Sequence, residues 1–271
     1  MASVTTPLSP CGPRAGCSDI DRVTALTVGI TTAHFPACKR GLAVNLAAIR
    51  ARLAPDASVC VVDADPLGLD VTTRFAVGGP CLEDNATHLV PIDALASVHE
   101  PPLRVLPSAG GGFSLAARAA SRALPHLRAN FDVVVCDLPP GPVGPGRVLG
   151  ALEQLDWLLV AVTPDVEPVE HAAHMFEYLD AAIERAEVAS SVRIGVVTTG
   201  DEGSTDLGPD VVERALGRPV VGSVRQLWGR AVPNLGFGAA LGIDELDDAV
   251  DTLFGRLGRR SARDTAVSRS S

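Results

Sequence analysis

Short, almost wholly apolar runs alternate with helix-like stretches along most of this chain, and this alternation is its most restrictive feature. Each run is continuous, which is typical of strands buried on both faces of a sheet. We predict strands at 23–30, 58–62, 103–106, 132–136, 157–162, 192–197 and 220–224, and helices at 39–53, 114–128, 167–184, 209–216 and 244–257. Strands that alternate with crossover helices form a mostly parallel, doubly wound sheet flanked by helices. The sequence therefore predicts an α/β fold in a single domain.

The two ends of the chain differ from this middle part. Residues 1–21 are rich in Pro, Ser, Thr and Gly and show no periodicity, while residues 259–271 are polar and locally basic. Segments of this kind at chain ends are usually poorly ordered. We therefore expect a flexible N-terminal tail, a folded domain over 22–258 and a flexible basic C-terminal tail.

Composition excludes several classes of protein. Hydrophobic residues make up 46% of the chain and its formal net charge is −9, which favours a globular domain over a general polyanion binder. No apolar run approaches the ~20 residues of a membrane-spanning helix, and the first residues lack the pattern of a secretory signal. The six cysteines form no CxxC pair and no metal-ligand spacing. We expect a cytoplasmic protein with reduced thiols.

The basic residues are strongly biased towards arginine. Of the 23 lysines and arginines, only Lys39 is a lysine. It opens the first predicted helix, after the loop that follows the first predicted strand, and phosphate-binding loops place a lysine there. In such loops, backbone N–H groups and the helix N-terminus cradle phosphates, and the lysine ammonium neutralises phosphate oxygens. We interpret Lys39 as a phosphate-facing residue; the alternative is a solvated lysine at the start of a helix.

Acidic residues follow two of the predicted strands. The second strand leads into Asp63 and Asp65, and the strand at 132–136 leads into Asp137 and the segment that ends at Gly141. Ligands bind at the carboxyl ends of strands in doubly wound sheets, and carboxylates there can orient Mg²⁺ or a nucleophilic water. The alternative is that these residues form turns, because Asp-x-Asp-Pro and Asp before Pro-Pro favour turns.

Several segments together resemble the ParA/MinD family of deviant P-loop ATPases. They are AVNLAAIRARL, VVDADPLGLD, LRVLPSAGGG, FDVVVCDLPPG and LLVAVTPD, and the resemblance covers about residues 22–258. It implies the P-loop NTPase fold, with ATP and Mg²⁺ as cofactors. It also implies roles for residues at matching positions: Asp65 is catalytic, Asp137 is the metal ligand, and nucleotide is bound by Lys39, Arg40, Gly41, Asp63 and Gly141.

The phosphate loop departs from the family pattern. The family motif K-G-G-x-G-K-T-T falls on residues 34–41, where this chain reads HFPACKRG. The glycines that let the backbone approach phosphate are replaced, and Pro36 removes one N–H donor. His34 stands in place of the family's signature lysine, and Arg40 in place of the hydroxyl that binds Mg²⁺. We predict weakened or lost ATP hydrolysis, and a pairing of Arg40 with Asp65 or Asp137 that substitutes for the metal's charge.

The resemblance leaves two functions open. The first is a pseudo-ATPase scaffold that helps to place the chromosome, the septum or polar machinery. The second is an active Mg-ATP-dependent enzyme that switches between monomer and dimer. The implied partners are a protein of a positioning, secretion or pilus system and a second copy of the chain.

Two further contacts are weaker expectations. A DNA-facing patch would use Arg214, Arg218, Arg225 and Arg230, although four arginines are more often a solvated surface. The end of the predicted last helix, LFGRLGRR, has the composition of a short amphipathic membrane-binding segment. It would bring the protein to the inner face of the membrane, whereas packing of this helix on the sheet is the preferred interpretation.

Overall fold

The computed structural model describes residues 25–33, 39, 41–68, 70–98, 102–141, 149–185, 191–200, 207–225, 252 and 254–255. These residues form one domain around an eight-stranded sheet with the strand order β3-β4-β2-β5-β1-β6-β7-β8. The strands are β1 (Leu26–Thr32), β2 (Val59–Asp63), β3 (Ala96–Val98), β4 (Leu103–Leu106), β5 (Val133–Asp137), β6 (Trp157–Val162), β7 (Arg193–Gly200) and β8 (Val220–Arg225). Every neighbouring pair is parallel except β3–β4. The predicted doubly wound, mostly parallel sheet is confirmed.

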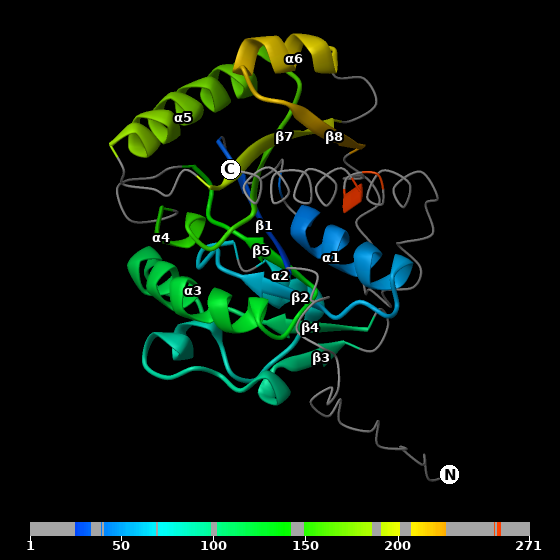
Figure 1. Ribbon diagram of the computed structural model, residues 1–271, viewed down its shortest axis with the longest axis vertical. Coiled ribbons are helices and arrows are strands. Elements are labelled where there is room, and N and C mark those ends of the chain that lie inside the picture. Colours follow the sequence, from blue (N-terminus) through cyan, green and yellow to red (C-terminus); the bar gives the residue numbers. More distant parts are fainter. Residues whose placement is uncertain are drawn as a thin grey trace, which may run out of the picture.

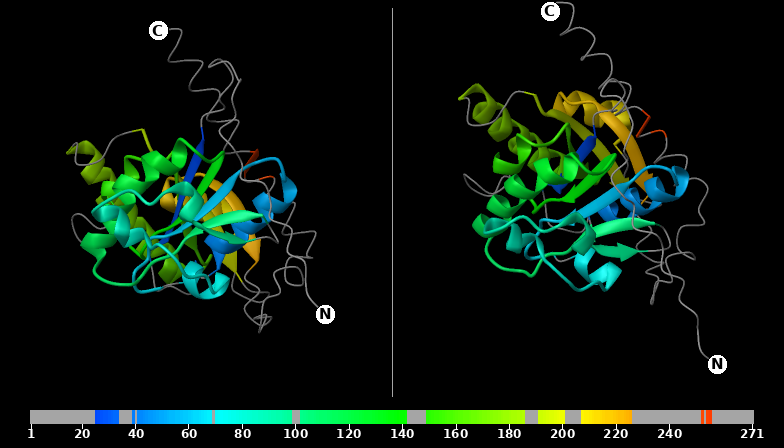
Figure 2. Two further views of the ribbon diagram at one scale, coloured as in Figure 1. Left: turned by 90° about the horizontal axis from the view of Figure 1, so that it is seen from below. Right: turned by 60° about the horizontal axis from the view of Figure 1, so that its bottom comes forward.

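Helices cover both faces of this sheet (Figures 1 and 2). They are α1 (Leu42–Leu53), α2 (Asp70–Phe75), α3 (Phe113–Arg128), α4 (Leu149–Leu152), α5 (Val166–Glu184) and α6 (Pro209–Leu216), with short 3-10 helices η1 (Leu82–Ala86) and η2 (Ile92–Ala94). Helices α1 and α2 belong to one hydrophobic cluster and α3 to α6 to the other. Within the described residues, no helix is long and apolar enough to cross a membrane.

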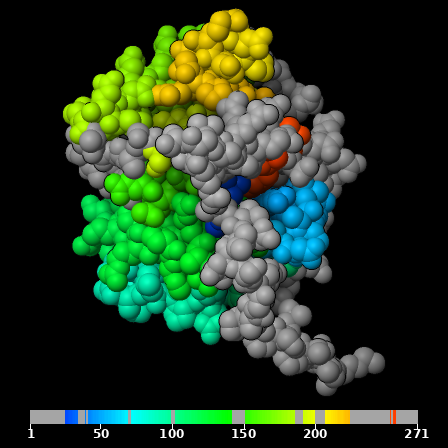
Figure 3. Space-filling model, in the orientation of Figure 1, coloured from blue at the N-terminus to red at the C-terminus, as the bar shows by residue number. Residues whose placement is uncertain are grey.

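Strand β5 shows why the strand sequences are continuously apolar. Val133 and Val135 pack into the cluster of α1, while Val134 and Cys136 pack into the cluster of α3. Successive side chains of a strand point to opposite faces, so a strand covered on both sides needs apolar residues at every position. The outer face of α6 is exposed at the surface seen in Figure 3, whereas in α1 only Arg52 and Leu53 at its end are exposed.

Most predicted elements are confirmed, with differences at their ends. The strands at 103–106 and 157–162 and the helix at 209–216 have the predicted bounds, whereas β7 continues to Gly200 and β1 begins at Leu26. The last two residues of β7, Thr199 and Gly200, continue the strand by pairing with β8 alone. The sequence did not predict α2, α4, β3 or the 3-10 helices, which are too short to show a periodic pattern.

Both predicted tails lie outside the described residues, as does most of the predicted helix at 244–257. Within that helix, Thr252 and Phe254 are helical, and Phe254 is buried in the cluster of α1. The Arg50 guanidinium lies 5.6 Å from the centre of the Phe254 ring. This contact supports the interpretation that the last helix packs on the domain.

Candidate functional site

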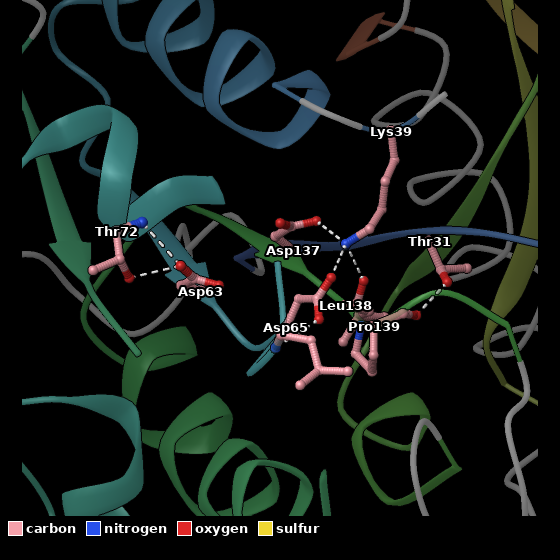
Figure 4. A network of polar contacts seen from close by, with 9 residues as sticks. Thr31, Lys39, Asp63, Asp65, Thr72, Asp137, Leu138 and Pro139 are labelled. Atoms are coloured by element: carbon pink, nitrogen blue, oxygen red, sulfur yellow. Dashed lines mark hydrogen bonds and ion pairs between the residues drawn. The ribbon is translucent and has the colours of Figure 1, made fainter. Parts of the chain in front are cut away.

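The carboxyl ends of β1, β2 and β5 meet at one edge of the sheet, because these neighbouring strands are parallel. Strand β2 ends at Asp63 and β5 at Asp137, and these two residues are register partners across the ladder. Lys39 precedes α1, the helix that follows β1. The sheet therefore brings together residues that are about a hundred positions apart in the sequence (Figure 4).

The Lys39 ammonium lies between two of the predicted site carboxylates. Its Nζ donates to Asp65 Oδ2 at 2.9 Å, to Asp137 Oδ1 at 2.8 Å and to the carbonyl oxygen of Leu138 at 2.5 Å. An ammonium has three N–H donors, so each of them has an acceptor within the protein. Lys39 is 4% exposed and the side chains of Asp65 and Asp137 are 2% and 4% exposed. The result is a buried ion-pair triad.

Burial and charge act in opposite directions on this triad. Burial disfavours the Lys39 ammonium, but attraction to Asp137 and Asp65 outweighs burial and raises the pKa of Lys39. Burial raises the pKa of Asp137 to about 7, even though the ammonium opposes the rise. The lysine therefore stays charged, while Asp137 is the member of the triad whose ionisation is costly.

Asp63 is held by a different element. Its Oδ2 accepts hydrogen bonds from the Thr72 backbone N–H at 2.9 Å and from Thr72 Oγ1 at 2.6 Å. Its Oδ1 is buried and has no hydrogen-bond partner among the described residues. Burial raises the pKa of Asp63, and the hydrogen bonds from Thr72 and the charge of Lys39 oppose this rise. Asp63 therefore adds a third buried carboxyl group to the site.

A chain of hydrogen bonds extends from Asp63 towards η1. The Ser108 N–H donates to Thr72 Oγ1 at 2.9 Å, and Ser108 Oγ donates to Glu83 Oε1 at 2.6 Å. The Ala109 N–H donates to Glu83 Oε2 at 2.9 Å. These contacts fix the loop after β4 against α2, and through Thr72 they fix the Asp63 carboxyl group.

The remaining predicted residues lie around the triad or outside the described part of the chain. Gly41 precedes α1 with φ 77°, and the guanidinium of Arg74 lies beside it, 3.2 Å from where a Cβ at Gly41 would stand. Gly141 has φ 67°, and its N–H donates to the Thr32 carbonyl at 2.6 Å. Such values are unfavourable for residues with a Cβ, which explains glycine at both positions. Arg40 lies outside the described residues, so its pairing with Asp65 or Asp137 stays a prediction.

Two contacts hold the loop after β5 against β1. Thr31 Oγ1 donates to the Pro139 carbonyl at 2.7 Å, and the Leu138 N–H donates to the Ile30 carbonyl at 2.9 Å. They direct the Leu138 carbonyl towards Lys39, which adds a neutral acceptor to the site (Figure 4). Sequence reasoning did not find Thr72, Ser108, Glu83 or the Leu138 carbonyl. No motif marks them, because their roles depend on which loops and short helices the fold brings together.

The arrangement does not fit the Mg²⁺ ion that the family resemblance implies. Mg²⁺ requires near-octahedral oxygen ligands and usually keeps several waters. Here the facing oxygens of Asp65 and Asp137 are bonded to an ammonium, and the triad is almost fully excluded from solvent. The described residues include no group of three His, Cys, Asp or Glu side chains arranged to hold a metal ion.

The histidines of α5 and two buried cysteines do not join this site. His171 and His174 lie on α5, where His174 is exposed, and Cys60 and Cys136 are buried free thiols. Burial raises the pKa of both thiols above the ordinary range, which makes thiolate chemistry unfavourable there.

Comparison with known proteins gives matches only among solved structures. No family model and no curated protein matches the chain. MinD cell division protein from Aquifex aeolicus is 17% identical with a TM-score of 0.63, over 85% of this chain and 98% of that one. An ATP complex of a variant of Cyanothece McdA is 18% identical with a TM-score of 0.66, over 88% and 98% of the two chains.

A plasmid partition protein from Borrelia burgdorferi is 15% identical with a TM-score of 0.61, over 86% of this chain and 99% of that one. These similarities span nearly the whole length of each solved structure. The likeness to MinD, McdA and plasmid partition structures confirms the fold that the resemblance implied. The chain has the P-loop NTPase fold of the ParA and MinD ATPases.

Proposed function

We propose that this chain is a ParA/MinD-type protein of intracellular positioning that acts as a scaffold without ATP hydrolysis. The fold supports the general role, because solved structures with this fold include a MinC:MinD cell division complex and a plasmid partition protein. The loss of hydrolysis is supported by one observation above all. The lysine that would neutralise phosphate is bonded to Asp65, Asp137 and the Leu138 carbonyl.

Freeing this lysine for a nucleotide has a large energetic cost. Breaking a buried ion pair by removing one partner typically costs about 3–5 kcal/mol, because a buried charge is left uncompensated. A phosphate group would have to supply that energy through a loop that lacks the family's glycines and carries Pro36. Backbone N–H groups normally provide most of the contacts in such loops. Weak or absent nucleotide binding follows from this combination.

The alternative is an active Mg-ATP-dependent enzyme that alternates between monomer and dimer. It is favoured by the retention of Lys39 beside Asp65 and Asp137, the residues at the carboxyl ends of the strands. A lysine side chain is flexible, and a bound triphosphate could draw its ammonium away from the carboxylates. In this alternative the triad is the resting state of a working site.

One experiment separates the two functions. ATP binding and turnover are measured with and without Mg²⁺ for the wild-type chain and for Lys39→Ala, with Arg218→Ala as a control at an exposed ion pair far from the site. The scaffold predicts no turnover and no stabilisation by millimolar ATP in any of the three proteins. Mg²⁺-dependent turnover that Lys39→Ala abolishes and Arg218→Ala retains would establish the enzyme instead.

The partners that we propose are a protein of a positioning, secretion or pilus system and a second copy of the chain. DNA contact is a weaker part of the proposal, because Arg218 is paired with Asp180 and stacks on Phe176. Arg214 is exposed on α6, and the side chains of Arg225 and Arg230 lie outside the described part of the chain. Membrane contact also has less support, because the buried Phe254 directs part of the last helix towards the domain. A cytoplasmic location remains part of the proposal.

A further inference from the structure

The site formed by the buried carboxyl groups of Asp63, Asp65 and Asp137 contains its own cation, the Lys39 ammonium. We propose that the Lys39 ammonium takes the place of a divalent metal between Asp65 and Asp137, so that the chain carries a latent metal site which this lysine keeps closed. This inference deepens the proposed scaffold function and rests on it.

The contacts of Lys39 use the same types of ligand atom that a bound metal cation would use, at hydrogen-bond distances. One carboxylate oxygen from β5, one from the segment after β2 and one backbone carbonyl surround Nζ at 2.5–2.9 Å. Hard divalent cations use the same types of ligand, namely carboxylates and carbonyls. The lysine reaches them from the segment that precedes α1 (Figure 4). The ammonium therefore joins α1, β2 and β5 in the manner of a structural metal.

The charge of the site favours a resident cation. Asp63, Asp65 and Asp137 provide three buried carboxyl groups, and among the described residues Lys39 is the buried cation that pairs with Asp65 and Asp137. Asp63 Oδ1 has no hydrogen-bond partner among the described residues, so acceptor capacity remains in the site even with the lysine in place. Without Lys39, the three carboxyl groups would be left without this positive charge in a region that excludes water.

The same geometry keeps a metal out of the wild-type protein. A divalent ion between Asp65 and Asp137 would lie beside a buried ammonium, and repulsion between like charges is strong where water is excluded. The side chains of the triad are at most 4% exposed, so little solvent is available to complete a coordination shell. Removal of the lysine side chain takes away the competing charge and opens space for an ion with bound water.

The test uses Mn²⁺ as the probe, followed by electron paramagnetic resonance and by thermal unfolding. Three full-length proteins are compared: wild type, Lys39→Ala and the double variant Lys39→Ala/Asp137→Asn. We expect no Mn²⁺ binding and no shift in melting temperature for wild type. We expect Lys39→Ala to bind Mn²⁺ and to melt several degrees higher in its presence, and the double variant to lose both effects.

Two results would overturn the inference. One is Mn²⁺ binding by wild type that Asp137→Asn removes, because the lysine would then not exclude the metal. The other is a folded Lys39→Ala protein that Mn²⁺ neither binds nor stabilises. If Lys39→Ala does not fold alone, the yield of folded protein with and without Mn²⁺ becomes the measurement. A higher yield of folded Lys39→Ala with Mn²⁺, which is lost in Lys39→Ala/Asp137→Asn, supports the inference. An unchanged yield contradicts it.

The outcome is separable from that of the proposed function. ATP turnover by wild type without any metal requirement would contradict the scaffold function, but not the inference that Lys39 takes the place of a metal. A wild-type protein that has no ATP turnover but binds Mn²⁺ through Asp137 would contradict the replacement of a metal by Lys39, but not the scaffold function.

Discussion

Asp63 and Asp137 occupy matched positions on the neighbouring parallel strands β2 and β5, yet different elements hold their carboxyl groups. Thr72 of α2 donates two hydrogen bonds to Asp63, whereas Lys39 donates a charged one to Asp137. Two buried carboxyl groups this close repel each other when both are ionised, and this repulsion contributes to the raised pKa of Asp137. The stability of the site therefore depends on Lys39 and Thr72 separately.

Removing the lysine charge should destabilise the protein strongly. Lys39→Met keeps an unbranched side chain but leaves Asp65 and Asp137 without their cation. We expect a loss of about 3–5 kcal/mol in the free energy of unfolding, measured by urea denaturation without divalent ions. Arg218→Met is the control, because its ion pair with Asp180 is partly exposed and should be worth at most about 1 kcal/mol. Equal losses in the two variants would contradict the buried triad.

Stability should fall with rising pH because of Asp137. Burial raises the pKa of this carboxyl group to about 7, well above its value in the unfolded chain. Between these two values the folded state binds more protons than the unfolded state, so the contribution of Asp137 to stability is present at low pH and is lost as the pH rises towards 7.

This pH effect is isolated by comparison with Asp137→Asn, which cannot titrate. Urea unfolding is measured for both proteins from about pH 4 to about pH 8. We expect the wild type to lose stability relative to the variant across this interval. A difference between the two that does not change with pH would show that the Asp137 pKa is the same in the folded and unfolded states.

The Thr72 hydroxyl should contribute measurably to the site. Thr72→Val removes the hydroxyl that donates to Asp63 and accepts from the Ser108 N–H, while the shape of the side chain is kept. Leaving buried polar groups unsatisfied costs about 1–3 kcal/mol, and we expect a loss of this size in thermal or urea unfolding. Thr73→Val, at an exposed position of the same helix, is the matched control and should be nearly neutral. Neutral behaviour of Thr72→Val would refute the role of this hydrogen-bond chain.

A methyl group at Gly68 should disturb the triad from outside. A Cβ there would stand 2.6 Å from Asp65 Oδ2, the oxygen that accepts from Lys39. Because that carboxylate is already held by the ammonium, it cannot move away freely, and we expect Gly68→Ala to cost about 1–3 kcal/mol. Gly78→Ala is the control, since no atom lies within 4 Å of its added Cβ. If both variants unfold at the same urea concentration, Asp65 is more mobile than the structure indicates.

The sequence contains enough information to predict the fold and the meeting of the site residues. Continuously apolar strands predict a parallel sheet, and the ends of parallel strands meet at one edge. Asp65, Asp137 and Lys39 could therefore be expected to lie together. The partner of the lysine was not predictable, because a long flexible side chain can reach either a phosphate or a carboxylate from the same backbone position.

The sequence also does not predict the local contacts of the backbone. The Leu138 carbonyl faces Lys39 because Thr31 and Ile30 hold the loop after β5, and nothing in the residue types records this. Helix α2, which supplies Thr72, has six residues and too few turns for a hydrophobic period to appear. The structure thus adds the hydrogen-bonding details that the residue pattern leaves open.

The burial of Lys39 also determines where amine chemistry can occur on this protein. Lys39 carries the only side-chain amine of the chain, and it is 4% exposed and hydrogen-bonded through all its donors. An acylating reagent can reach it only when this region of the protein opens. The rate of acylation of Lys39 therefore reports how often this region opens locally. Acylation at Lys39, resolved from acylation of the N-terminal amine by peptide mapping, thus reports local opening without any introduced label.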